Sequence, residues 1–214
     1  MGVDVHASPQ VMTDQPVLIP CRGGRTVNAQ SPARLTEIEE PPVTTAAERA
    51  LALEHWLLSA TGDQESARVE WAGMGVAMLR CGTLFSAVRM PADWIEAAAG
   101  SRAPENIAAY LNQALNGGAV FVDTTCRWFY FLVPASTCDR WNVPGTMCLG
   151  PDTYLGVPRP GEWHGVRTAR SYWCVEMDGP AALCVPNAVM QLAVHARYRM
   201  AQADDSPNVG GARG

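Results

Sequence analysis

Hydrophobic residues recur along the middle of this chain with two periods, and these periods predict where helices and strands lie. An apolar stripe at helical spacing predicts a helix over about 104–116. Other helices are expected from the capping box Thr45-Ala-Ala-Glu48, over 91–100, and from a cap at Asn187 onward. Short runs of apolar and aromatic residues predict strands over 76–79, 84–90, 119–123, 127–133, 153–157 and 171–177. The first two strands are expected to pair as a hairpin.

The expected helices and strands come in separate runs rather than in strict alternation. This order favours an α+β fold of one domain, with helices packed on a mostly antiparallel or mixed sheet. Residues 1–43 are rich in Pro, Gly, Thr and Gln and are expected to form a disordered leader, and residues 203–214 a flexible tail. The folded domain is therefore expected to span residues 44–202, an ordinary size for a single domain.

The composition narrows the chemistry that this chain can carry. Its 214 residues have a net charge of −5, and all 16 basic residues are arginine. The negative charge argues against a broad basic surface for nucleic acid, although a local arginine patch remains compatible with it. The absence of lysine excludes a Walker A lysine, a Schiff-base lysine and a lysine general base. No stretch approaches about eighteen uncharged apolar residues, so no membrane span and no membrane partner are expected.

The seven cysteines are an odd number and contain no C-x-x-C pair. Zinc sites need ligands paired at short spacing, and disulfide frameworks need an even count. The N-terminus also lacks a charged segment followed by an apolar run, so no signal peptide is expected. The sequence therefore predicts reduced, mostly buried thiols in a cytoplasmic protein.

Three segments in the second half of the chain have a characteristic order and spacing of strand and turn residues. They are Cys126–Pro134, Thr153–Pro160 and Ser171–Cys174, with the sequences CRWFYFLVP, TYLGVPRP and SYWC. Together they resemble the core strands of the bifunctional DNA primase/polymerase domain of the archaeo-eukaryotic primase superfamily, over roughly residues 45–178. The resemblance implies a primase-polymerase-like α+β fold that binds nucleotides and nucleic acid in DNA replication.

The residues that would make this family an enzyme depart from its pattern. Polymerase chemistry needs divalent metals held by carboxylates, and the corresponding strand, Leu84–Pro91, contains no acid. Arg89 stands about where an acid belongs, and its guanidinium would repel Mg²⁺. The family's histidine is also absent, with Trp128 or Phe129 near its place. We therefore expect a catalytically degenerate domain without a cofactor, in which Mg²⁺ or Mn²⁺ matters only if polymerase activity survives.

Arginines on or beside the three segments are the candidates for binding phosphate, because the guanidinium fork matches phosphate oxygens. They are Arg80, Arg89, Arg127, Arg159 and Arg170. Trp128 and Tyr154 are the candidates for stacking on bases. The alternative is that the arginines are scattered surface residues paired with acids, and that the aromatics belong to the core or to cross-strand pairs.

Two further sets of residues bear on function. Glu176 and Asp178 are either a metal-binding pair or a solvated strand end. Cys126 and His164 are the one cysteine–histidine combination to consider for nucleophilic catalysis. The expected function is binding of a nucleotide or single-stranded nucleic acid by a degenerate domain. The alternative is a protein-interaction or regulatory domain that uses the fold as a scaffold for a protein partner.

Overall fold

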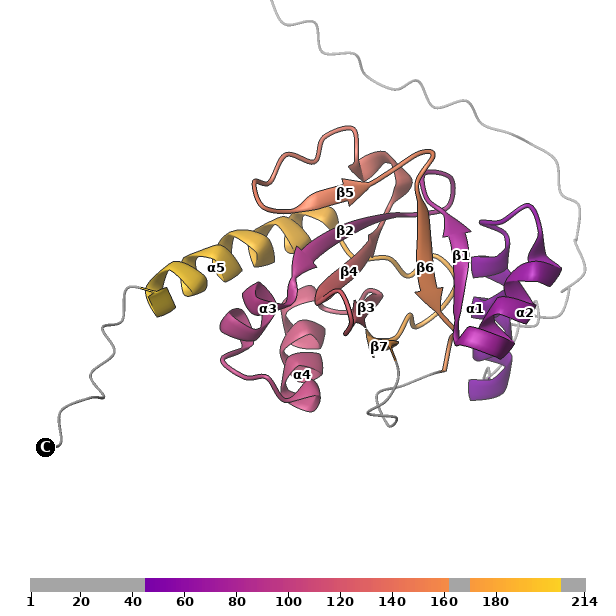
Figure 1. Ribbon diagram of the computed structural model, residues 1–214, viewed down its shortest axis with the longest axis horizontal. Helices are drawn as coiled ribbons and strands as arrows, with labels where there is room; N and C mark the ends of the chain where they lie inside the picture. Colours follow the sequence, from indigo (N-terminus) through magenta and orange to yellow (C-terminus); the bar gives the residue numbers. More distant parts are fainter. Residues whose placement is uncertain (1–44, 162–169, 205–214) are drawn as a thin grey trace, which may run out of the picture. The chain divides into compact units, whose positions relative to one another are not determined.

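The computed structural model describes residues 45–161 and 170–204, and these residues form a single-domain α+β fold. They contain five α-helices, a two-stranded sheet and a five-stranded sheet, and every strand pair is antiparallel (Figure 1). The predicted fold class is confirmed. The expected leader and almost all of the expected tail lie outside the described residues.

The helices form where local sequence signals are strong. Their bounds are α1 (Ala46–Leu58), α2 (Gln64–Met74), α3 (Ala92–Ala99), α4 (Pro104–Leu115) and α5 (Pro186–Asp204). The predicted capping box is confirmed, because the Glu48 amide donates to Thr45 Oγ1 at 3.2 Å and the Thr45 amide donates to the Glu48 carboxylate at 2.8 Å. No helix in the described part of the chain is long and apolar enough to cross a membrane.

Two helix predictions need correction. The sequence did not predict α2, because the residues before Gly75 give a weak helix signal and those after it are typical of a strand. The Asp63 carboxylate starts this helix by accepting a first-turn backbone N–H at 3.0 Å, and Gly75 ends it in the left-handed region at φ 71°. α5 begins at Pro186 rather than after a cap at Asn187, because a proline in the first turn loses no helical hydrogen bond.

The strands form two sheets. Their bounds are β1 (Val76–Arg80), β2 (Ser86–Pro91), β3 (Val120–Asp123), β4 (Trp128–Val133), β5 (Met147–Leu149), β6 (Tyr154–Pro158) and β7 (Ser171–Val175). The five-stranded sheet has the order β5-β2-β4-β3-β7, and β1 pairs with β6. Only β5, a three-residue strand at the edge of the larger sheet, had no counterpart among the predicted strands.

The predicted hairpin between β1 and β2 is wrong, because β1 pairs with β6 over its whole length. The Cys81 amide continues that ladder by donating to the Thr153 carbonyl at 2.8 Å. Gly82 then turns the chain at φ 91°, with its backbone against Pro151 so closely that a Cβ would lie 2.5 Å from the Pro151 Cα. The turn therefore directs β2 into a different sheet.

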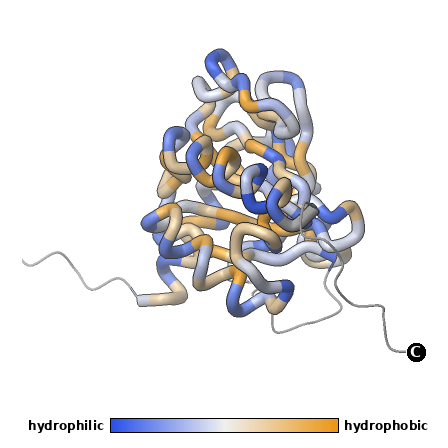
Figure 2. The backbone as a smooth tube through the Cα atoms, turned by 90° about the vertical axis from the view of Figure 1, so that its left-hand side faces the viewer, coloured by the Kyte–Doolittle hydropathy of each residue, from blue (hydrophilic) through white to orange (hydrophobic). Residues whose placement is uncertain are grey.

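The five-stranded sheet separates two hydrophobic cores, and the strand β4 contributes to both. Phe129, Phe131 and Val133 belong to the core beneath α3, α4 and α5. Leu132 and the half-buried Tyr130 belong to the core beneath β1, β6, α1 and α2. Along the helical coils in Figure 2, hydrophobic and hydrophilic residues alternate, as expected of helices that bury one side.

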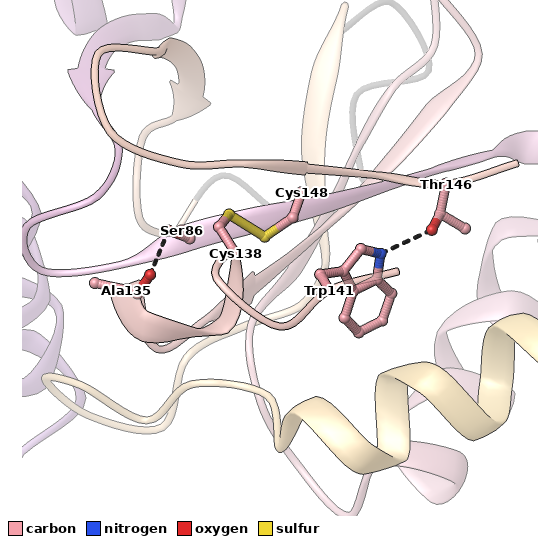
Figure 3. The surroundings of a disulfide bond; sticks show 6 residues. All are labelled: Ser86, Ala135, Cys138, Trp141, Thr146 and Cys148. Atoms are coloured by element: carbon pink, nitrogen blue, oxygen red, sulfur yellow. Dashed lines mark hydrogen bonds between the residues drawn. A yellow bond between two sulfur atoms is a disulfide. The ribbon is translucent and has the colours of Figure 1, made fainter. Parts of the chain in front are cut away.

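The expectation that all cysteines are reduced is wrong for one pair. Cys138 and Cys148 form a disulfide, with their Cα atoms 5.3 Å apart (Figure 3). A short 3₁₀ helix, η1 (Ala135–Thr137), and the strand β5 bring these two residues together. Among the other described cysteines, three are buried free thiols, and Cys126 is an exposed one.

Candidate functional site

A cleft of about 280 Å³ lies between the β1–β6 sheet and the larger sheet. One wall is mostly apolar and comes from α2, β1 and β6; its residues are Met74, Val76, Met78, Leu155 and Gly156. The opposite wall is polar and comes from the larger sheet; its residues are Asp123, Tyr130, Arg170 and Ser171. The cleft can therefore receive a ligand with one flat or apolar part and one charged part.

Arg89 lies next to this cleft rather than in its lining, within the strand β2. It is the cross-strand partner of Tyr130, and its guanidinium lies 4.8 Å from the centre of the Trp128 ring. Its Nε atom is buried without a hydrogen-bond partner, and Arg89 forms no ion pair with any carboxylate in the described ranges. A buried, positively charged N–H group that has no hydrogen-bond acceptor destabilises the fold. Arg89 is thus available to an anionic ligand.

Tyr130 is held in the cleft by the core beneath it. Its ring stacks on the buried ring of Phe121, with the centroids 4.9 Å apart. Burial raises the pKa of Tyr130, the carboxylate of Asp123 raises it further, and the charge of Arg89 opposes both. The hydroxyl therefore stays protonated at neutral pH and can donate a hydrogen bond to a ligand in the cleft.

Arg170 reaches the same cleft from the chain segment before β7. Its carbonyl accepts the Thr124 amide at 2.8 Å, which fixes its backbone to the β3–β4 turn. Its Nε lies 3.5 Å from Thr125 Oγ1, a long contact, and no carboxylate among residues 45–161 and 170–204 forms an ion pair with it. Arg170 is therefore a second cation on the polar wall that an anion can approach.

The only carboxylate of the polar wall is already engaged. Asp123 Oδ1 accepts the amides of Thr125 at 2.8 Å and Cys126 at 3.0 Å, which closes the β3–β4 turn. Arg127 completes this turn in the left-handed region at φ 56°. Because Asp123 serves the turn, its charge does not neutralise Arg89 or Arg170 by direct pairing.

Three of the five predicted phosphate-binding arginines are paired with acids elsewhere on the domain. Arg127 contacts Asp93 at 2.5 Å and Glu96 at 2.9 Å on α3. Arg80 contacts Asp152 at 2.7 Å, and Arg159 contacts Glu54 on α1 at 3.3 Å; together these three arginines use the acids Asp93, Glu96, Asp152 and Glu54. The five arginines do not converge: Arg170 lines the cleft, and Arg89 lies next to it as the cross-strand partner of Tyr130.

The predicted stacking residues also separate. Trp128 is half-buried beneath the guanidinium of Arg89 at the cleft end of β4. Tyr154 is 62% exposed on β6, opposite Arg80 in the β1–β6 ladder, and does not line the cleft. Neither residue lines the cleft, but Trp128 contacts Arg89 next to it, whereas Tyr154 lies opposite Arg80.

The predicted metal pair lies beyond the end of β7. Glu176 and Asp178 are exposed on either side of the buried Met177. The described residues contain no group of three or more His, Cys, Asp and Glu side chains that could hold a metal ion. The two carboxylates therefore have the environment of a solvated strand end.

Cys126 is a poor nucleophile in this environment. A hydrogen bond to Asp123 and the charge of that carboxylate raise the pKa of the Cys126 thiol, and the charge of Arg170 opposes them only in part. The thiol is thus protonated at neutral pH, whereas a catalytic cysteine needs its thiolate. His164, its expected partner, lies outside the described residues.

Two larger hollows have less suitable chemistry. One, of about 510 Å³, is lined by Asp93, Glu96 and Arg102. Its acids already bind Arg127 and Arg102, the latter with Nε 3.0 Å from Glu96, so its charges are satisfied internally. The other, of about 480 Å³, lies between α5 and the loop after β4. This second hollow has Arg140 beside Trp141 in its lining, but the carboxylate of Asp139 lies there as well, so an anion would meet charges of both signs.

Sequence reasoning missed the apolar wall of the cleft. Tyr130 becomes a site residue only because the β2–β4 register places it opposite Arg89, and Met78 only because β1 pairs with β6. Neither pairing leaves a local signal in the sequence. No protein-family model, curated protein or solved structure matches this chain.

Proposed function

We propose that this protein binds a nucleotide or single-stranded nucleic acid in the cleft, as a primase-polymerase-like domain that has lost catalysis. The observation that carries this proposal is the pair of cations near Tyr130, Arg89 and Arg170, which form no ion pair with a carboxylate of the described residues. The guanidinium groups would bind phosphate oxygens, and the Tyr130 hydroxyl would donate to the same group. The apolar wall, including Met78 and Leu155, would contact a base or sugar.

A binding titration tests this proposal. We expect a fluorescein-labelled oligothymidylate, or ATP in competition with it, to bind at low salt and to dissociate as salt increases. Arg89→Gln and Arg170→Gln should each weaken binding about 10-fold or more, because a hydrogen bond to a charged group contributes about 1.5–3 kcal/mol. Arg127→Gln is the matched control, since this arginine is paired with Asp93 and Glu96 and should leave the affinity unchanged.

The outcome against the proposal is equally specific. Absence of binding at low salt, or an equal loss in Arg127→Gln and Arg89→Gln, would contradict it. A primer-extension and de novo priming assay with Mg²⁺ and Mn²⁺ tests the lost catalysis, and no incorporation is expected. Incorporation abolished by Glu176→Ala or Asp178→Ala would show that an active metal site survives. A role in DNA replication rests on the family resemblance and is part of this proposal.

A protein-interaction domain is the second candidate, and one observation favours it. The apolar residues Met190, Val194 and Tyr198 are exposed on α5 at positions i, i+4 and i+8, so they form one stripe. If this stripe is the functional surface, Val194→Asp should abolish association of the domain with its protein partner, whereas Gln191→Asp should not. Sedimentation velocity measures this association. The oligonucleotide would then show no binding at low salt.

The cytoplasmic location expected from the sequence remains a prediction. The Cys138–Cys148 disulfide bears on this location, because disulfides in reducing compartments are usually transient, catalytic or redox-sensing. A cytoplasmic protein with this bond would therefore be expected to form and break it.

A further inference from the structure

The Cys138–Cys148 disulfide closes a loop at the edge of the larger sheet. Cys138 follows η1, and Cys148 is the middle residue of β5 (Figure 3). The end of η1 nearer β4 is fixed independently, because the buried Ser86 hydroxyl donates to the Ala135 carbonyl at 3.1 Å. The loop 139–147 is thus attached to a rigid base at one end and to β5 at the other.

Apart from the disulfide, this loop has few attachments to the rest of the domain. The Trp141 indole donates to Thr146 Oγ1 at 2.8 Å, and this bond lies within the loop itself (Figure 3). Val143 is the one fully buried loop residue, the half-buried Trp141 packs against the same core, and Gly145 packs on the Trp94 ring of α3. β5 contributes three residue pairs with β2. A three-residue edge strand with one buried loop residue is marginal without a cross-link.

The strand that the disulfide fixes is the neighbour of Arg89. In the β2–β5 ladder, Met147 pairs with Arg89 and Cys148 pairs with Val88. On its other side β2 pairs with β4, which places Tyr130 opposite Arg89. Release of β5 would therefore free one edge of the backbone that carries the Arg89 side chain.

Among the described cysteines, solvent reaches the exposed thiol of Cys126 and the disulfide pair. Cys138 and Cys148 are half-buried, so a small dithiol can reach the bond. Burial raises the pKa of Cys81 to about 11 and that of Cys184 to about 12, and it also raises the pKa of Cys174. Because thiolates are the reactive form, these three thiols are inert at neutral pH.

We propose that Cys138–Cys148 is a reversible thiol–disulfide switch that controls the Arg89 side of the cleft. A dithiol reductant attacks the bond through a mixed disulfide, so the S–S bond breaks and two cysteine thiols form. The dithiol supplies two electrons and two protons and becomes a disulfide itself. The reduced loop and β5 detach from β2, and ligand binding weakens; only this last step rests on the proposed function.

Hydrogen exchange tests the switch without any ligand. The protein is oxidised with diamide or reduced with dithiothreitol, and exchange is measured by mass spectrometry for peptides that cover 139–149 and 84–91. We expect exchange in 139–149 to accelerate on reduction by on the order of 10- to 100-fold, the effect of losing the cross-link of a short loop. Re-oxidation should restore the slow exchange, and peptides from α4 should not change.

Matched variants and the oligonucleotide titration complete the test. Cys126→Ser should respond to dithiothreitol like the unchanged protein, and the Cys138→Ser/Cys148→Ser double variant should not respond. Reduction should weaken oligothymidylate binding about fivefold. Unchanged exchange on reduction, or alkylation of both cysteines after diamide treatment, overturns the switch even if binding persists. If exchange responds but no oligonucleotide binds to either form, the proposed function fails and the coupling to it fails with it, whereas the redox control of the loop stands.

Discussion

The two faces of β4 differ in what covers them. Phe129, Phe131 and Val133 lie on the face that α3, α4 and α5 cover, and all three are at most 3% exposed. On the other face Leu132 is fully buried, but Tyr130 and Trp128 are only partly covered. One strand therefore provides a complete core on one side and, on the other, a core that borders a cleft.

The difference follows from the geometry of the covering elements. Three helices lie on one face and fill it with apolar side chains. The other face is covered by two strands and two helices, and the cleft lies between these strands and the larger sheet at Tyr130. Polar groups at the cleft keep contact with solvent and with any ligand. The cleft is thus a consequence of how the strands β1 and β6 cover the larger sheet.

The largest effect is expected where the cover is complete. Phe131 is fully buried in the central strand beneath the helices, so Phe131→Ala should lower the free energy of unfolding by about 3–5 kcal/mol. Urea unfolding of the oxidised protein measures this change. Trp128→Ala is the comparison on the other face and should cost clearly less, since Trp128 is half-buried. If both variants lowered the free energy of unfolding equally, the two faces of β4 would not differ in how completely they are covered.

Local signals account for the parts of the fold that were predicted. The capping box at Thr45 and the apolar stripe of α4 each involve residues within a few turns of one helix, and both are confirmed. Pairing between distant segments has no such signal. β1 pairs with β6 rather than with β2, although β2 and β6 are both apolar strands of similar length.

The candidate site shows the same limit. The sequence singled out Arg89 and Arg170, but it could not separate them from Arg127, whose acids come from α3. Which arginine is paired depends on the register of β2 against β4 and on the place of α3, both of which are tertiary properties. The disulfide was missed for a related reason, since an odd cysteine count does not say which two residues meet.

An intermediate effect is expected where α2 holds the partial cover in place. The buried Trp71 indole donates to the Val157 carbonyl of β6 at 2.9 Å. Trp71→Phe removes this donor and with it the side-chain hydrogen bond between α2 and β6, which should cost about 0.5–1.5 kcal/mol. Urea unfolding measures the cost, and hydrogen exchange of β6 should accelerate more than that of β4. A loss confined to β4, or no loss at all, would mean that Trp71 does not hold the cover.

The smallest effect is expected at the turn that closes the open end of β4. The Asp123 carboxylate raises the pKa of Cys126 above its ordinary value of 9.0 through a hydrogen bond and through its charge. The thiolate therefore appears only at higher pH, and the rate of iodoacetamide labelling should follow it. Asp123→Asn keeps an oxygen acceptor for the turn amides but removes the charge, so the labelling curve should shift to lower pH.

Labelling at pH 8 should consequently be faster in Asp123→Asn than in the unchanged protein. Mass spectrometry of the Cys126 peptide measures the rate, and the buried Cys81 and Cys184 are internal references that should remain unlabelled. Labelling of these references would show that the variant has opened the core rather than changed one charge. If only Cys126 responds, the charge of Asp123 acts on the exposed end of the sheet. The helix-covered face of β4 should then be unaffected, because no charged group acts on it through this turn.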